Sequence, residues 1–158
     1  MPRPAASDGS TRMDKTYTTP LTPELNCTNI ETSLAFYVGV LGFTIQYQRP
    51  EEGFAMLERQ GSRLMLDQLH GIDGAGRSWL AGPLERPYGR GINLQMQTDN
   101  VDALYAKVNE SGAPVFLPIE KKWYRRDDVY LGNRQFIVQD PDGYLLRFFE
   151  DLGEKKAL

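Results

Sequence analysis

One arginine stands in an otherwise apolar run near the C-terminus, V-Q-D-P-D-G-Y-L-L-R-F-F-E, residues 138–150. The run reads as a strand, a tight turn and a second strand, and Leu145, Arg147 and Phe149 share one face of that second strand. Both faces are mostly apolar, which predicts a strand covered on both sides. A guanidinium there stays protonated near neutral pH and repels a metal cation, so it favours a carboxylate or an anionic ligand as its neighbour.

Other side chains able to do chemistry are scattered. A catalytic metal site needs about three converging protein ligands. The single histidine, His70, ends a predicted strand, and Glu58 and Asp67 are strand carboxylates of the kind that usually face solvent. The single cysteine, Cys27, is expected to be an inert buried thiol. Serine-nucleophile, phosphate-loop and dinucleotide motifs are absent from the sequence. We therefore predict no catalytic residue, no bound metal and no cofactor.

The composition fits a globular domain that binds neither nucleic acid nor a membrane. The chain has 158 residues, 41% of them hydrophobic, and a net charge of −3, with no basic patch and no run of membrane-spanning length. One cysteine excludes an internal disulfide and fits a reducing compartment, so we expect a cytoplasmic protein. Residues 1–20 are polar, lack a secretory signal and are predicted to form a flexible arm.

The elements that must position these side chains occur twice in the same order. A strand, a helix and three strands are predicted at 21–28, 30–41, 43–49, 54–59 and 62–69, and again at 92–98, 101–110, 114–119, 134–139 and 144–150. Gly42 and Gly112, 70 residues apart, end the two helices. The pattern predicts an α+β fold of two βαβββ modules, 21–70 and 91–152, joined by a linker at 71–90. They form one domain, 21–152, followed by a tail at 153–158. Two such sheets can curve around a shared groove.

Two segments carry a family resemblance: N-I-E-T-S-L-A-F-Y-V-G-V-L-G-F, residues 29–43, and the D-P-D-G run above. Over roughly residues 21–152 the chain resembles the glyoxalase/bleomycin resistance/dioxygenase superfamily, also called the vicinal oxygen chelate fold. The resemblance implies that enzymes of this kind hold a divalent metal with His, Glu or Gln from the first and last strands of each module. Those positions fall near residues 22–24, at Met65, at Gly91 or Asn93, and at Arg147. Only Glu24 is a ready ligand.

The resemblance therefore places Arg147 in the groove, where relatives carry a metal-binding carboxylate. Asp67 is its candidate partner there. The alternative is an edge-strand arginine whose guanidinium reaches out to water.

Among metal-free members, the chain is most similar to bleomycin-resistance proteins, through residues 53–66, 134–143 and the L-L-R that follows the hairpin. The resemblance implies a homodimer with exchanged N-terminal segments, whose grooves trap a cationic drug between aromatic rings and acidic side chains. We expect a metal-independent protein, not an enzyme, that sequesters a flat, partly aromatic small molecule such as a glycopeptide antibiotic. The predicted ligand-binding residues are Phe54, Asp67, Trp79, Trp123, Tyr124, Tyr130 and Arg147.

Two other functions stay open: a metal-dependent glyoxalase-type lyase or dioxygenase with atypical ligands, and a silent module that acts through protein partners. Several site residues also have plainer interpretations. W-Y-R-R-D-D, residues 123–128, can be a solvated loop anchored by Trp123, and Trp79 can pin the linker to the core. Tyr130 precedes Leu131-Gly132, where bleomycin-binding relatives carry Trp-Gly, and it can replace that ring.

Overall fold

The order βαβββ occurs twice along the chain, as the sequence predicts. The computed structural model describes residues 19–70 and 79–156. The first module contains β1 (Glu24–Cys27), α1 (Ile30–Leu34), the π-helical turn η1 (Ala35–Val40), β2 (Thr44–Arg49), the 3-10 turn η2 (Pro50–Glu52), β3 (Phe54–Arg59) and β4 (Ser62–Gln68). The second contains β5 (Asn93–Gln97), α2 (Val101–Ser111), β6 (Val115–Arg126), β7 (Val129–Gln139) and β8 (Leu145–Lys156). None of these helices is long and apolar enough to cross a membrane.

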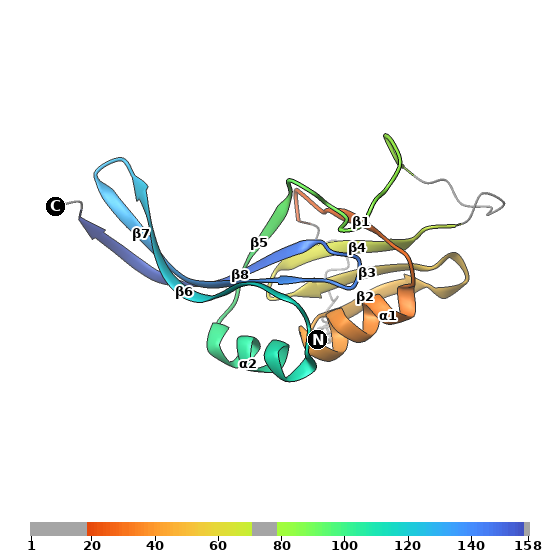
Figure 1. The fold of residues 1–158 in the computed structure, drawn as a ribbon, viewed down its shortest axis with the longest axis horizontal. Coiled ribbons are helices and arrows are strands. Elements are labelled where there is room, and N and C mark those ends of the chain that lie inside the picture. The colour runs from red at the N-terminus through yellow and green to blue at the C-terminus, as the bar shows by residue number, and fades with distance from the viewer. Residues whose placement is uncertain (1–18, 71–78, 157–158) are drawn as a thin grey trace, which may run out of the picture.

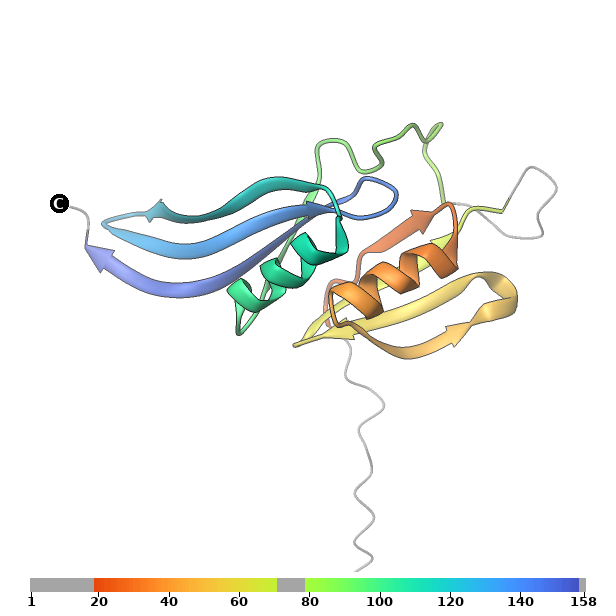
Figure 2. The same ribbon diagram turned by 60° about the horizontal axis from the view of Figure 1, so that its bottom comes forward.

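Each module forms one four-stranded sheet, in the orders β1-β4-β3-β2 and β5-β8-β7-β6. The first and last strands of each module run parallel, and the other neighbours are antiparallel. Figures 1 and 2 show α1 and α2 side by side, each covering one face of its own sheet. We call the opposite face of each sheet its open face. The predicted α+β fold is confirmed.

A single hydrophobic core joins the two modules on the helix side of both sheets. Phe136 is fully buried there, with its ring centroid 5.1 Å from that of Tyr105 on α2 and 5.7 Å from that of Phe148 on β8. Burying one such ring contributes roughly 1.5–3 kcal/mol. Leu64 and Tyr37 bring the first module into the same core. Because one core serves both modules, each sheet keeps only its other face for a ligand.

The two helices begin in the same way. The side chains of Asn29 and Asn100 each accept a hydrogen bond from the first turn of the following helix, at 2.9 and 3.0 Å. The first backbone N–H of each helix donates to a side chain on the last strand of its own module, Gln68 on β4 for α1 and Glu150 on β8 for α2. Gln68 and Glu150 are therefore equivalent positions in the two modules. This equivalence fixes how the rest of β4 corresponds to β8.

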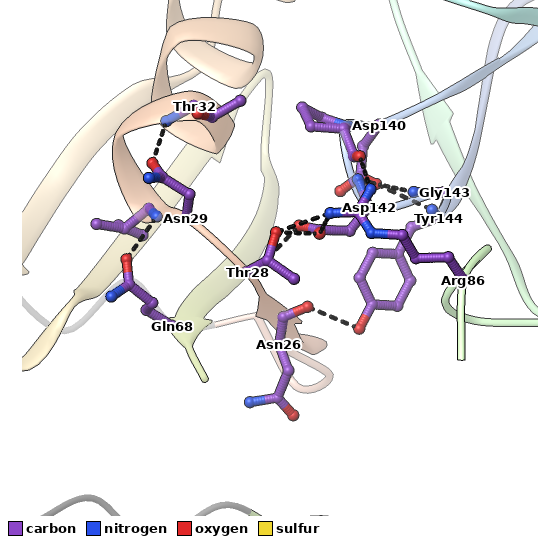
Figure 3. A network of polar contacts seen from close by, with 12 residues as sticks. Asn26, Thr28, Asn29, Thr32, Gln68, Arg86, Asp140, Asp142, Gly143 and Tyr144 are labelled. Carbon is purple, nitrogen blue, oxygen red and sulfur yellow. Dashed lines mark hydrogen bonds and ion pairs between the residues drawn. The ribbon is translucent and has the colours of Figure 1, made fainter. Parts of the chain in front are cut away.

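The D-P-D-G turn between β7 and β8 fastens the second module to the first (Figure 3). Asp140 Oδ1 accepts the backbone N–H groups of Asp142, Gly143 and Tyr144, each at 2.9 Å, which closes the turn. Asp142 then accepts the N–H and hydroxyl of Thr28, just after β1, at 3.2 and 2.7 Å. We call this set of hydrogen bonds the latch.

Two further contacts complete the latch. Arg86 of the linker donates to Asp142 Oδ1 at 2.9 Å. The Tyr37 hydroxyl donates to Asp140 Oδ2 at 2.8 Å, and burial, followed by the charge of Asp140, raises the pKa of Tyr37 well above its usual value. The tyrosine thus stays protonated and remains a donor. The start of β8, and with it Arg147, is held at the end of β1.

Strands β6, β7 and β8 are longer than predicted and project from the core as an arm (Figure 1). Residues 123–126, treated above as a possible solvated loop, belong to β6, and a turn at Asp127 and Asp128 leads into β7. Residues 153–156, predicted to be a tail, continue β8 beside β7. The sequence did not predict these strand extensions, because polar side chains on both faces leave no alternation of apolar and polar residues. The flexible N-terminal segment predicted at residues 1–20 lies outside the described residues, except for residues 19 and 20.

Candidate functional site

Arg147 points to the open face of the second module. Its strand neighbours are Gln95 on β5 and Ile137 on β7, while Leu146 and Phe148 point into the core. A cavity of about 490 Å³ lies on this face. Residues from β5, β6, β7 and β8 line it: Gln95, Tyr124, Arg126, Leu131, Asn133, Arg147, Phe149, Asp151, Gly153 and Glu154. The sequence alternation around Arg147 is confirmed, although this cavity belongs to one module and not to both.

Hydrogen bonds fix the phenol ring at one side of the cavity. Gln135, only 2% exposed, donates through Nε2 to the hydroxyl of Tyr124 at 2.7 Å and to Glu120 Oε1 at 3.0 Å. The ring of Phe149 also lines the cavity, from β8. The site therefore presents two aromatic rings carried by strands, which are rigid supports.

Some charged side chains at the cavity have hydrogen-bond or ion-pair partners, and Arg147 Nε has none. Arg126 and Glu154 pair at 2.6 Å, and Asp151 accepts the backbone N–H of Gly153 at 2.7 Å. Arg147 differs, because its Nε atom is buried and has no hydrogen-bond partner. Among the described residues, the guanidinium of Arg147 forms no ion pair.

Asp67, the predicted partner of Arg147, lies on the other sheet. It stands opposite Phe54 of β3 and Asn26 of β1, on the open face of the first module. Burial is the main cause that raises the pKa of Asp67, while His70 and Arg49 lower it. Within the described part of the chain, Asp67 and Arg147 form no ion pair. The predicted pairing is thus not present within one chain.

The open face of the first module combines two aromatic rings, a guanidinium and two acidic groups. The guanidinium of Arg49 lies 4.0 Å from the ring centroid of Phe54, and the ring of Tyr47 lies 5.9 Å from it. Burial, together with the charge of Asp67, raises the pKa of Glu24 on β1. This face therefore carries two carboxyl groups and the guanidinium of Arg49, which lowers the pKa of both carboxyl groups against the effect of burial.

The structure divides the predicted ligand residues into groups. Tyr124 and Arg147 line one cavity, and Phe54 and Asp67 are neighbours on the other module. Trp79 is 74% exposed in the linker. Tyr130 does not line the cavity. None of these placements tests ligand contact, so the roles of these residues stay predictions.

Trp123 lies on the face of β6 opposite Tyr124. Its ring packs on Gly132, where an added Cβ would come within 2.6 Å of it, and Lys155 Nζ lies 4.2 Å from its centroid. Sequence reasoning missed Gln95, Leu131, Asn133 and Phe149 at the cavity. The alternation around Arg147 could have identified Phe149.

The side chains at and beside the positions where the resemblance implies metal ligands are poor donors for a metal ion. Glu24 pairs with Met65 in the first module, and Gln95 pairs with Arg147 in the second. The predicted position in the opening strand of the second module, Gly91 or Asn93, offers no carboxylate, imidazole or thiolate and stays a prediction. Within the described ranges, no three His, Cys, Asp or Glu side chains converge. A set that includes a thioether and a guanidinium does not fit a divalent metal.

Comparison with known proteins places this chain in a family. The model of the Glyoxalase/Bleomycin resistance protein/Dioxygenase superfamily matches residues 19–148. The chain belongs to this superfamily. A bleomycin resistance protein of Geobacillus stearothermophilus is 25% identical over 141 residues, which cover 82% of this chain and 95% of that protein. The sequence resemblance noted above is confirmed.

Two solved structures are also similar to this superfamily member. A glyoxalase/bleomycin resistance protein/dioxygenase superfamily member from Vibrio splendidus 12B01 is 37% identical, covers 82% of this chain and 97% of its own, and has a TM-score of 0.37. TioX from Micromonospora sp. ML1 is 22% identical, with a TM-score of 0.63 over 85% of this chain and 100% of its own. The second likeness supports the fold.

Proposed function

We propose that this protein binds and sequesters a flat, partly aromatic small molecule without a metal and without transforming it. The observation that carries the proposal is the cavity of about 490 Å³ on the open face of the second module, with the rings of Tyr124 and Phe149 at its wall. Cavities of this size hold drug-sized ligands. Glycopeptide antibiotics are one candidate class, because relatives with 25% identity are named bleomycin resistance proteins.

Stacking supplies the affinity in this proposal. Each well-placed aromatic pair contributes about 0.5–1.5 kcal/mol beyond the area that it buries. Gln135 holds the Tyr124 hydroxyl, so little ring freedom is lost on binding. A preformed stacking site needs neither a nucleophile nor a general base.

Metal-assisted chemistry is disfavoured by the donor set. The positions that the resemblance assigns to metal ligands fall near residues 22–24, at Met65, at Gly91 or Asn93, and at Arg147, and only Glu24 among them is a ready ligand. The fixed positive charge of Arg147 would repel a divalent ion at that point. We therefore infer a cytoplasmic protein that binds its ligand by mass action and so keeps the bound ligand from acting elsewhere.

A homodimer completes the site in our proposal. One chain presents an open face with the rings of Phe54 and Tyr47 on its first module, and an open face with Tyr124 and Arg147 on its second. A second copy that places its first module over the second module of its partner would join these faces. The ligand would then lie between two copies.

The test is ligand-dependent melting of the purified full-length chain, with bleomycin and a panel of planar aromatic compounds. A ligand selective for the native state stabilises it by about 2.7 kcal/mol at 100 times its Kd. Tyr124→Ala should remove most of the shift. Phe116→Ala, which removes a 60% exposed ring elsewhere on β6, should keep it. Stoichiometric Fe, Ni, Zn or Mn that is lost on chelation would contradict the proposal and favour the enzyme.

A further inference from the structure

Arg147 differs from the described arginines that form ion pairs. Arg49, Arg86, Arg126 and Arg134 each meet a carboxylate within hydrogen-bonding distance. At Arg147, by contrast, the Nε atom is buried and has no acceptor. Leaving a charged donor unsatisfied in a buried position is costly, so a buried guanidinium is expected to meet an acceptor. No described residue supplies an acceptor to Arg147 Nε, which leaves this donor available to a ligand.

The groups beside Arg147 are also suited to an acceptor. The Tyr124 hydroxyl accepts from Gln135 Nε2, which leaves its own hydrogen free to donate into the cavity. Gln95, directly across from Arg147, and Asn133 bring amide groups that can donate. These donors lie beside the ring of Phe149.

Two carboxylates also line the cavity, and each contacts another group, although only Glu154 is paired with a cation. Glu154 is paired with Arg126 at 2.6 Å, and Asp151 Oδ1 accepts the N–H of Gly153 at 2.7 Å. Neither forms an ion pair with Arg147 within the described part of the chain. An incoming anion would therefore meet a guanidinium that forms no ion pair with a described residue.

We propose that the ligand of this cavity is a planar aromatic carboxylate. Its ring system lies against Phe149 and Tyr124, and its carboxylate accepts from the guanidinium of Arg147. The planar fork of a guanidinium matches a carboxylate in shape, which favours this anion. The inference rests on the proposed function and narrows it, because it specifies the charge that the ligand brings to the second module.

The experiment compares three probes that share one ring system and differ in charge: 2-naphthoate, 2-naphthamide and 2-naphthylmethylammonium. Each is titrated calorimetrically into the full-length protein at pH 7. A charge-assisted hydrogen bond predicts that naphthoate binds at least about tenfold more tightly than the amide, and the ammonium more weakly still. Arg147→Gln should lower naphthoate affinity by about tenfold or more and leave amide affinity within about twofold.

Arg125→Gln is the matched control. It removes the same charge from an exposed side chain on the face of β6 opposite Tyr124, so naphthoate affinity should stay within about twofold of wild type. The comparison of the three probes on the wild-type chain needs no variant, so it holds even if Arg147→Gln folds poorly.

The outcomes separate the two proposals. Equal or tighter binding of the amide or the ammonium would overturn the carboxylate inference and leave the binding function standing. Failure of all three probes to bind at millimolar concentration would also overturn the carboxylate inference, while the melting test with bleomycin and the wider panel decides the binding function. If Arg147→Gln instead dissociates a dimer in sedimentation velocity, the acceptor is a carboxylate of a second copy, and the inference is also overturned.

Discussion

Two acidic side chains on the open face of the first module resist ionisation. Burial is the leading cause that raises the pKa of both Glu24 and Asp67, and the charge of Asp67 adds to the effect on Glu24. A carboxyl whose pKa is higher in the folded protein holds its proton more tightly there than in the unfolded chain. Its contribution to stability is complete below the unfolded value, about 3.9 for Asp, and is lost as pH rises through the folded value.

We therefore predict that Asp67→Asn gains stability relative to wild type between pH 3.5 and pH 7, in urea unfolding monitored by circular dichroism. Asp102→Asn is the control of opposite sign. Hydrogen bonds from Arg134 lower the pKa of Asp102 in the folded protein. Asp102→Asn should therefore lose stability relative to wild type as pH rises from 3.5 to 7. A relative stability of Asp67→Asn that does not change with pH would contradict the burial of this carboxyl.

At the same scale, period-two alternation was enough to place Arg147, since both faces of its strand carried recognisable side chains. Trp123 and Tyr130 show where that method fails. Both were chosen as aromatic residues near an expected groove, but a face can be assigned in a strand only once the strand is recognised. The position of Trp123 depends on Gly132, whose missing Cβ makes room for the ring. No rule of composition gives that contact.

At the level of elements, the latch couples the turn between β7 and β8 to β1 and the linker (Figure 3). Asp142, 1% exposed, receives the N–H and hydroxyl of Thr28 and the guanidinium of Arg86. We predict that Asp142→Ala lowers the free energy of unfolding by about 2–4 kcal/mol, because buried donors lose their acceptor. Urea denaturation at pH 7 measures the change.

The matching control is Glu85→Ala. Glu85 meets Arg90 at 3.3 Å, with both side chains mostly exposed, so its removal should cost less than about 1 kcal/mol. If both variants lost the same stability, the latch would not be what joins the modules.

The sequence predicted the helices that have capping residues, but it did not predict the strand segments that lack an apolar pattern. Asn29, Asn100 and the two terminal glycines gave both helix starts and the end of the second helix. The second half of the first helix is π-helical, which its apolar stripe could not reveal. The arm formed by β6, β7 and β8 is stabilised mainly by pairing between its own strands, and that pairing leaves no hydrophobic period in the sequence.

For the whole molecule, the shared core explains why one chain has two separate open faces. The helix sides of both sheets are buried against each other, so the face with Asp67 and the face with Arg147 are left for other partners. The sequence predicted one groove between two modules but could not say whether those modules belong to one chain. That choice depends on how modules pack, and a linear pattern does not encode it.

A mixing experiment tests whether grooves form between copies. Phe54→Ala alters only the first module, and Tyr124→Ala alters only the second, so each variant alone should bind 2-naphthoate weakly in calorimetry. In a dimer whose grooves combine the first module of one copy with the second module of the other, a mixed dimer contains one wild-type groove and one doubly altered groove. After unfolding and refolding together at equal amounts, about a quarter of all grooves should regain wild-type affinity. A groove built within one chain would regain none, because every chain would still carry one altered half.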